Sequence, residues 1–278
     1  MKKLFLAILA SFVAICATAG TVTKHFDRLA SFSRINISDF FKTSIVQSDE
    51  CKVVVTIDSA VEDYLEVNVI GNVLYLRLKE RDLKTTIRNI SNLKMEATVF
   101  CPSLSAIYLT GAASVNSSDK WVSPMEKFTL EMNGATKAEK LRIEGMELKL
   151  ILSDAANAGI AGNFETLDIN ATGASVLSMA TDCSEVSAIL EDTSKVSLIG
   201  NTEELAANCK GTSFLDALEM KAENATVECS GASKSNVYVN NKLEVELKGI
   251  SNCHYRSGNE SLVVIPSVSR ASSLKRIR

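Results

Sequence analysis

Few residues of this chain could carry acid–base or nucleophilic chemistry. Histidine occurs only twice, as His25 and His254, near opposite ends of the sequence. A serine–histidine–aspartate triad needs a histidine held beside both partners, and the sequence contains no G-x-S-x-G, H-E-x-x-H, P-loop or dinucleotide-binding glycine motif. The sequence therefore predicts no catalytic residues, no cofactor site and no metal site.

Two aspartates are the strongest candidates for chemistry. Asp154 and Asp192 occupy the same position of a repeat, two units apart. If the units stack like β-strands, the two residues lie roughly 10 Å apart, which suits the paired carboxylates of an inverting glycoside hydrolase. Alternatively, each aspartate replaces a glycine at a corner, where Asp tolerates a left-handed backbone and hydrogen-bonds locally. We favour the corner, so a polysaccharide-active enzyme is the alternative prediction.

Cysteines supply the other candidate chemistry. Cys209 and Cys229 occupy the same inward position of adjacent repeat units. A strand spacing of about 4.8 Å is within the Cα separation that a disulfide can bridge. A disulfide and a buried pair of free thiols are therefore both open, and we favour the free thiols acting as small apolar side chains. The absence of any C-x-x-C motif argues against zinc binding and redox catalysis.

These candidates all belong to one internal repeat. Eight tetrapeptides of the Gly-Ala-Ser type recur, such as GAAS at 111–114 and GASK at 231–234, and their first positions differ successively by 23, 20, 19, 19, 19, 20 and 18. Apolar residues stand two, four and six positions before most lead residues, with polar residues between them, which is the pattern of a half-buried strand. The lead residues, which we expect at structural corners, are Gly111, Gly134, Asp154, Gly173, Asp192, Gly211, Gly231 and Gly249.

The repeat predicts an all-β fold, a parallel β-helix-like solenoid with about 19–20 residues per coil, which is a period typical of solenoids. Each coil consists of a strand, the sharp Gly-Ala-Ser corner, a second strand and a looser corner. A propeller blade needs roughly forty residues, and a β-sandwich would not keep one register through eight copies. Equivalent residues of successive coils should stack and hydrogen-bond along the solenoid axis.

The N-terminal residues predict export. Lys2 and Lys3 precede an apolar run from 4 to 15 and a small-residue cleavage site at 17–19, so residues 1–19 read as a Sec-type signal peptide. Lipidation at Cys16 is less favoured because Ile15 precedes it. We expect a periplasmic, outer-surface or secreted protein, with no transmembrane segment in the mature chain. Removing the two lysines from the 30 basic residues leaves 28 against 33 acidic ones, a net charge of −5, which argues against nucleic-acid binding.

The rest of the chain divides into three parts. Residues 20–104 form an N-terminal β section that caps the solenoid within the same domain, and it includes a hairpin of 65–70 with 73–78 around Gly71-Asn72. Residues 105–266 form the repeat coils. Residues 267–278 are predicted to be a flexible basic tail.

The exported β section, the string VNVIGNVLYL and the repeated Gly-Ala-Ser corners together resemble the bacterial family described as "putative auto-transporter adhesin, head GIN domain". The resemblance covers residues 25–255 and implies a β-helix-like fold and a Gram-negative cell envelope. The Gly-Ile-Asn tripeptide itself is absent, the nearest string being GISN at 249–252. We also expect no membrane β-barrel translocator after residue 266. No functional residues carry over from the family.

The predicted function is that of an exported, non-catalytic envelope or cell-surface protein with a β-helical recognition face. Adhesion is the expected role, with a glycan or a protein at the cell surface as the partner. The alternatives are a polysaccharide-active β-helix enzyme and a structural envelope component.

Overall fold

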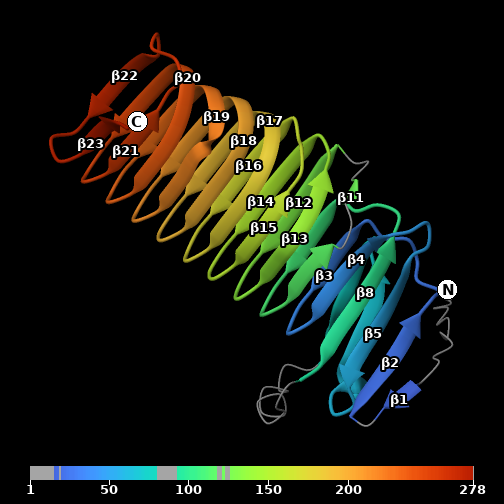
Figure 1. Ribbon diagram of the computed structural model, residues 1–278. Coiled ribbons are helices and arrows are strands. Elements are labelled where there is room, and N and C mark those ends of the chain that lie inside the picture. Colours follow the sequence, from blue (N-terminus) through green and yellow to red (C-terminus); the bar gives the residue numbers. More distant parts are fainter. Residues whose placement is uncertain (1–15, 19, 80–92, 118–120, 123–125, 278) are drawn as a thin grey trace, which may run out of the picture.

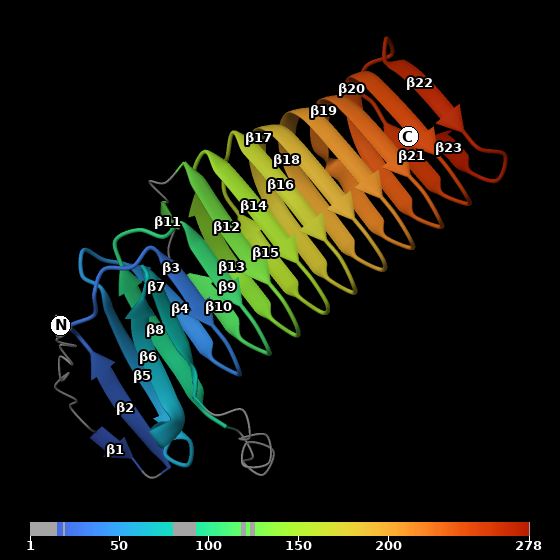
Figure 2. The same cartoon turned by 180° about the vertical axis from the view of Figure 1, so that it is seen from behind.

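The structure, a computed structural model, describes residues 16–18, 20–79, 93–117, 121–122 and 126–277. These residues form an elongated stack of β-coils, with the N-terminal strands at one end and the C-terminal strands at the other (Figures 1 and 2). The predicted fold class, an all-β parallel solenoid, is confirmed. Most of the predicted signal peptide lies outside the described residues. Within the described part, no helix has the length and apolar character needed to cross a bilayer.

Each coil contributes one strand to each of two facing layers. The first sheet holds the strands before the sharp corner, namely β3 (Arg34–Ile37), β9 (Ala106–Leu109), β12 (Lys127–Met132), β14 (Glu147–Leu152), β16 (Thr166–Ala171) and β22 (Val263–Val268). The second sheet holds those after it, namely β4 (Lys42–Gln47), β10 (Ser114–Ser117), β13 (Lys137–Glu144), β15 (Asn157–Ala161), β21 (Asn252–Arg256) and β23 (Ser273–Arg276). A short strand, β11 (Trp121–Val122), pairs with the end of β13.

Four long strands connect the two sheets in the C-terminal half. They are β17 (Val176–Leu190), β18 (Lys195–Cys209), β19 (Phe214–Cys229) and β20 (Lys234–Leu247). The first part of each lies in the second sheet, and the last part lies in the first sheet of the next coil. The looser corner expected at Gly200-Asn201 is therefore a bend inside a continuous strand, with no break in the ladder.

Hydrogen bonds along the solenoid axis explain the residue types at the sharp corner. All eight lead residues have φ between +59° and +89°, a region that glycine and aspartate tolerate best. This turns the carbonyl group of each of the first seven lead residues toward the next coil, where it accepts the N–H that follows the next lead residue. The N···O distances run from 2.6 to 3.1 Å, as between Ala174 and Asp154 or Ala135 and Gly111.

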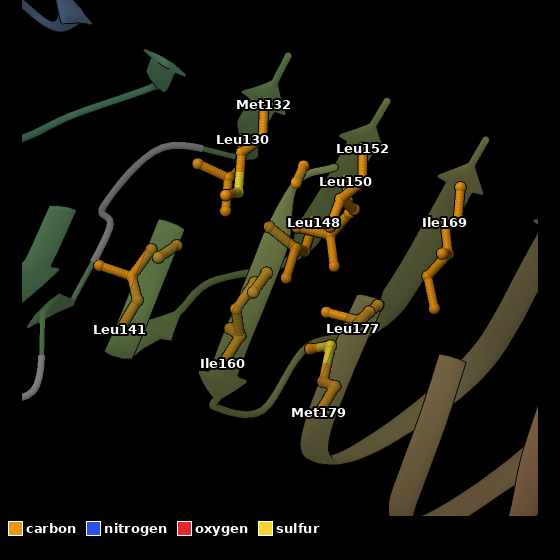
Figure 3. Packing of buried hydrophobic residues seen from close by; sticks show 14 of the residues in the cluster. Leu130, Met132, Leu141, Leu148, Leu150, Leu152, Ile160, Ile169, Leu177 and Met179 are labelled. Carbon is orange, nitrogen blue, oxygen red and sulfur yellow. The ribbon is translucent and has the colours of Figure 1, made fainter. Parts of the chain in front are cut away.

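The core lies between the two sheets. Figure 3 shows Leu130, Leu150 and Ile169 of the first sheet stacked in one row, directed toward Ile160 and Met179 of the second sheet. Leu150 is opposite Leu130 on one side and Ile169 on the other in the parallel register, so this row of the first sheet is apolar across three successive coils. Inward residues are almost fully buried from β3 to β20, and the last coil, with β22 and β23, is more exposed.

A row of small hydroxyl residues lies buried just after the corner, two positions beyond the lead residue. Ser233 donates its hydroxyl to the carbonyl of Cys209 at 2.9 Å. The equivalent hydroxyls of Ser175 and Ser194 are buried without a hydrogen-bond partner among the described residues. A buried hydroxyl that lacks a partner costs free energy, whereas a bonded one contributes about 1 kcal/mol.

Two alanine substitutions in this row should therefore have different effects on stability. Ser194→Ala is expected to leave the free energy of unfolding unchanged or to raise it by up to about 1 kcal/mol, because it removes an unpartnered group. Ser233→Ala is expected to lower it by about 1 kcal/mol, because the hydrogen bond to Cys209 is lost. Urea unfolding followed by far-UV circular dichroism checks both. Equal destabilisation by the two variants would contradict this account of the row.

The solenoid begins earlier than residue 105. β3 and β4 form a complete coil whose strands pair in parallel with β9 and β10, which follow much later in the sequence. Its corner residue is Asp39, with φ of +64°, and the carbonyl of Asp39 accepts the N–H of Ala112 at 2.8 Å. The sequence repeat does not reveal this coil, because a long insertion separates it from the next coil and because its corner lacks the Gly-Ala-Ser sequence.

The insertion between the first two coils forms the N-terminal end of the molecule. It holds β5 (Lys52–Asp58), the 3-10 turn η1 (Glu62–Tyr64), β6 (Leu65–Ile70), β7 (Val73–Leu78) and β8 (Met95–Cys101). β1 (Cys16–Thr18) and β2 (Thr21–Phe26) add antiparallel strands beside β5. β6 and β7 form the predicted antiparallel hairpin around Gly71-Asn72, and this prediction is confirmed.

The C-terminal segment also differs from the sequence prediction. Residues 273–276, placed in a flexible tail, form β23, which pairs in parallel with β21. β22 extends to Val268 and pairs with β20. The sequence of this segment is polar because its coil is the last of the stack and many of its side chains are exposed. Its backbone nevertheless continues the same ladder of hydrogen bonds. The N–H of Ser273, for example, donates to the carbonyl of Ser251 at 3.0 Å.

Candidate functional site

The outer face of the first sheet carries charges that compensate one another. Lys127 contacts Glu147 on the neighbouring coil at 2.6 Å, and this hydrogen bond raises the pKa of the lysine. Further along, Lys210 pairs with Glu191 at 3.0 Å. Two more pairs on the same face are Lys242–Glu244 and Lys248–Glu246. Exposed pairs of this kind contribute little to stability. They make the face a solvated surface on which these four lysines are paired with glutamates.

The outer face of the second sheet contains a hollow, which we call the trough. It has a volume of about 980 Å³ and lies over β13, β15, β17 and β18. Its floor consists of small side chains that face outward in two registered rows. Its lining includes Gly159, Ala161, Ser178, Ala180, Glu139, Lys140, Arg142, Asn116 and Ile199. The floor is low because small residues replace the longer side chains that neighbouring strands present at equivalent positions.

One row of the trough runs from a cation to an aliphatic side chain. Arg142 is opposite Ala161, Ala161 is opposite Ala180, and Ala180 is opposite Ile199. Ile199 is 52% exposed, so it presents an aliphatic side chain to solvent at the end of this row. The trough therefore has a charged wall on β13, a low apolar floor and an apolar wall on β18.

A β-bulge shapes the charged wall. Between Ala138 and Leu141 the register of β13 shifts, so that Glu139 and Lys140 together oppose Gly159 alone. Lys140 adopts φ of +56°, a conformation that non-glycine residues adopt infrequently. Bulges redirect side chains and are common beside functional sites. Here the bulge is part of the wall that lines the trough.

The two cations of the trough differ from the four paired lysines of the first sheet. Among the residues that the structure describes, no ion pair involves Lys140 or Arg142. Glu139 is the only carboxylate among the described residues of the lining, so these residues carry an excess of one positive charge. This arrangement suits a polar ligand with an anionic group, which two adjacent cationic side chains can bind with charge-assisted hydrogen bonds.

The two candidate aspartates lie away from the trough, at the sharp corners. Asp154 and Asp192 both have φ of +59°, and the carboxylate of Asp192 accepts the N–H of Gly173 from the neighbouring coil at 3.1 Å. This contact is the local hydrogen bonding that suits aspartate to a corner. Glycoside hydrolysis needs two carboxylates across the scissile bond, and the described lining of the trough holds one.

The cysteines of the coils form a buried stack. Cys209 and Cys229 are directly opposite each other in the register, and both are free thiols. The hydrogen bond to Cys229, together with burial, raises the pKa of Cys209, and burial raises the pKa of Cys253 to about 12. Protonated, buried thiols are poor nucleophiles and poor metal ligands. Within the described part of the chain, no group of three His, Cys, Asp or Glu side chains could hold a metal ion.

Sequence reasoning missed the trough, although the sequence contains a signal for its bulge. The spacing from Gly134 to Asp154 is longer by one position than each of the next three spacings. The additional residue is accommodated by the bulge at Glu139-Lys140. The spacing from Gly211 to Gly231 is longer by one position in the same way, and it likewise contains a register shift in β19. A longer spacing in a regular repeat thus indicates a bulge, at which the outward side chains change position.

Comparison with known proteins agrees with this architecture. The sequence profile of the family described as "Putative auto-transporter adhesin, head GIN domain" matches residues 31–259. No curated protein matches the chain in sequence.

Several solved structures share the fold, including three from Parabacteroides species. A putative adhesin from Parabacteroides distasonis has 15% identity and a TM-score of 0.67, over 92% of this chain and 97% of that one. A putative adhesin from Parabacteroides merdae has 12% identity and a TM-score of 0.64, over 94% and 97%. A protein described as a putative lipid binding protein from Parabacteroides distasonis has 16% identity and a TM-score of 0.62, over 94% and 98%. At these identities the likeness shows the fold alone.

Proposed function

Because this chain belongs to the family described as "Putative auto-transporter adhesin, head GIN domain", we propose that it is a non-catalytic cell-surface protein that binds an anionic glycan in the trough. Export through the predicted Sec-type signal and a role in adhesion are part of this proposal. The solenoid provides a rigid frame, and the trough provides the recognition site on its second sheet.

The observation that carries the proposal is the difference between the two outer faces. Four lysines on the face of the first sheet lie against glutamates, as Lys127 does against Glu147. Lys140 and Arg142 of the second sheet border a hollow instead, with Asn116 and Ser178 as further polar groups. A carboxylated or sulfated sugar offers the anionic group for the cations and hydroxyls for these polar side chains, over an apolar floor that fits the C–H faces of a sugar ring.

An amphiphile with an anionic head group is the second candidate. The row of Ala161, Ala180 and Ile199 leads from the cationic wall to an exposed aliphatic side chain. A lipid could place its head group at Lys140 and Arg142 and its chain along this row. The protein of similar fold described as lipid-binding adds support to this candidate.

Ligand retention tests the proposal. The purified chain should be retained on acidic glycans of a glycan array and should bind vesicles of zwitterionic phospholipid no better than background. Ala180→Trp, which fills the floor of the trough, should abolish retention because the ligand can no longer reach the sheet. Binding to vesicles that contain an anionic phospholipid, without retention on glycans, would select the amphiphile.

A matched substitution on the other sheet serves as the control. Asn170→Trp places the same side chain on an exposed position of β16, facing away from the trough, and should leave retention intact. Wild-type protein that retains neither acidic glycans nor anionic vesicles would overturn the proposed recognition function and favour a structural envelope component. Retention by Ala180→Trp at the wild-type level would place the binding site elsewhere.

A further inference from the structure

Two cysteines outside the repeat are brought together by the N-terminal insertion. β5 and β8 pair antiparallel, with Lys52 opposite Phe100 and Val53 opposite Val99. Continuing this register by one residue places Cys51 directly opposite Cys101. A side-chain contact agrees with the register of the neighbouring pair, because the Lys52 ammonium lies 4.8 Å from the centre of the Phe100 ring.

The hydrogen-bond pattern fixes the kind of pair that these cysteines form. The N–H of Asp58 donates to the carbonyl of Lys94 at 2.8 Å, so hydrogen-bonded pairs occur at every second position from there. Lys52 and Phe100 fall on such a position, and Cys51 and Cys101 fall between. The carbonyl of Cys101 is directed away from β5, toward the N–H of Ser48 at 3.0 Å. Side chains of a non-hydrogen-bonded pair lie closer together than those of the other type.

Both side chains lie on the same face of this sheet. Alternate residues of β5 from Val53 and of β8 from Met95 are buried, and Cys51 and Cys101 continue these two inward rows. Both are free thiols in the structure, with Cys101 fully buried and Cys51 partly exposed at the margin of the core. Burial and the neighbouring Cys51 raise the pKa of Cys101.

We infer that Cys51 and Cys101 form a disulfide when the chain meets a disulfide oxidant, such as a periplasmic dithiol oxidase or glutathione disulfide. The partly exposed Cys51 thiolate attacks the oxidant, forming a mixed disulfide and releasing one thiolate of the oxidant. The Cys101 thiolate then attacks the Cys51 sulfur and releases the second. Two thiols of the chain lose two protons and two electrons, and the oxidant is reduced to two thiols.

The second step precedes the complete burial of Cys101. A buried thiol with a raised pKa reacts slowly, so the bond should form while β8 is adding to β5 and β4 during folding. The bond closes a loop that contains the whole insertion between the first two coils. It therefore holds the antiparallel end of the molecule against the stack of parallel coils.

The stacked pair Cys209 and Cys229 is less suited to a disulfide. The two residues are in register on parallel strands, so their Cα–Cβ bonds point in the same direction and the Cβ atoms stay about one strand spacing apart, near 4.8 Å. Disulfides need Cβ atoms about 3.5–4.5 Å apart. A non-hydrogen-bonded antiparallel pair comes closer to this range. The structure thus assigns the oxidisable pair to the N-terminal insertion.

Peptide mapping of the full chain tests the inference. The protein is refolded with glutathione disulfide, denatured, alkylated without reduction and digested, and the peptides are identified by mass spectrometry. We expect a cross-linked peptide pair containing Cys51 and Cys101, and a loss of two titratable thiols per chain compared with fully reduced protein. Reductant should lower the melting temperature of the oxidised form by roughly 5–10 °C, because the loop is released.

Two variants provide the controls. Cys51→Ser should keep all its remaining thiols titratable after the same treatment and should melt at the same temperature with and without reductant. Cys209→Ser should still lose two thiols and give the same cross-linked pair. Complete alkylation of Cys51 and Cys101 in the oxidised wild-type sample would overturn the inference, as would a cross-link between Cys209 and Cys229. Neither result bears on glycan binding by the trough.

Discussion

Replacing Gly200 with alanine is expected to lower the free energy of unfolding by about 3 kcal/mol or more, one of the largest effects of a single methyl group added to this chain. Gly200 has φ of +130°, a conformation that side chains rarely permit. A Cβ atom there would lie 1.9 Å from the carbonyl oxygen of Thr181 on the preceding coil. Since that oxygen belongs to the backbone of the ladder, the clash can be relieved only by moving two coils apart.

Gly71→Ala provides a comparison at a glycine with positive φ and an open Cβ position. Gly71 also has a positive φ, of +57°, but no atom lies within 4 Å of its virtual Cβ. Its substitution should cost about 1 kcal/mol, the penalty for a left-handed alanine. Urea unfolding of both variants, followed by circular dichroism, measures the difference. A Gly200→Ala variant as stable as Gly71→Ala would mean that the coils do not pack as closely as described.

The second large effect is expected at the centre of the core. Leu150→Ala should lower the free energy of unfolding by about 3 kcal/mol, because it removes apolar contacts and leaves a cavity. Leu150 is fully buried and stacks between Leu130 and Ile169, so the cavity opens toward two neighbouring coils (Figure 3). In a solenoid, stability is the sum of coil and interface terms, and an interior substitution weakens two interfaces at once.

The same substitution in the last coil provides the comparison. Leu274 lies in β23, is only partly buried and has a coil on one side alone, where it is opposite Cys253. Leu274→Ala should therefore cost about 1 kcal/mol. Chemical denaturation measures both values. Equal losses for Leu150→Ala and Leu274→Ala would contradict a stack whose ends are less stable than its centre.

Much of the fold could be predicted from local patterns that repeat. The inward rows around Leu130, Leu150 and Ile169 follow from period-two alternation, and the corners follow from Gly or Asp at a fixed spacing. The first coil was missed because the whole N-terminal insertion separates Asp39 from its neighbour Gly111 in the sequence, and only tertiary pairing brings them together. The strand at 273–276 was missed because a polar end segment gives no apolar pattern, although its backbone continues the ladder.

The trough could not be predicted in the same way. Small residues such as Ala161 and Ala180 give no signal in the sequence. They form a hollow only because stacking places them side by side, between the longer side chains of Arg142 and Ile199. Lys140 gains its position from a bulge that one additional residue in the repeat allows. A surface assembled from several coils depends on register, which single segments do not reveal.

Binding of an acidic glycan to a charge-reversed trough tests the central claim most directly. The double variant Lys140→Glu/Arg142→Glu should bind the glycan retained by the wild type at least about tenfold more weakly, because two cationic contacts become repulsive. The control Lys210→Glu/Lys248→Glu makes the same change of charge directly after β18 and β20, at the edge of the first sheet, where both lysines pair with glutamates. It should bind like the wild type. Equal affinity of the trough variant and the wild type, or an equal loss in both double variants, would contradict recognition in the trough.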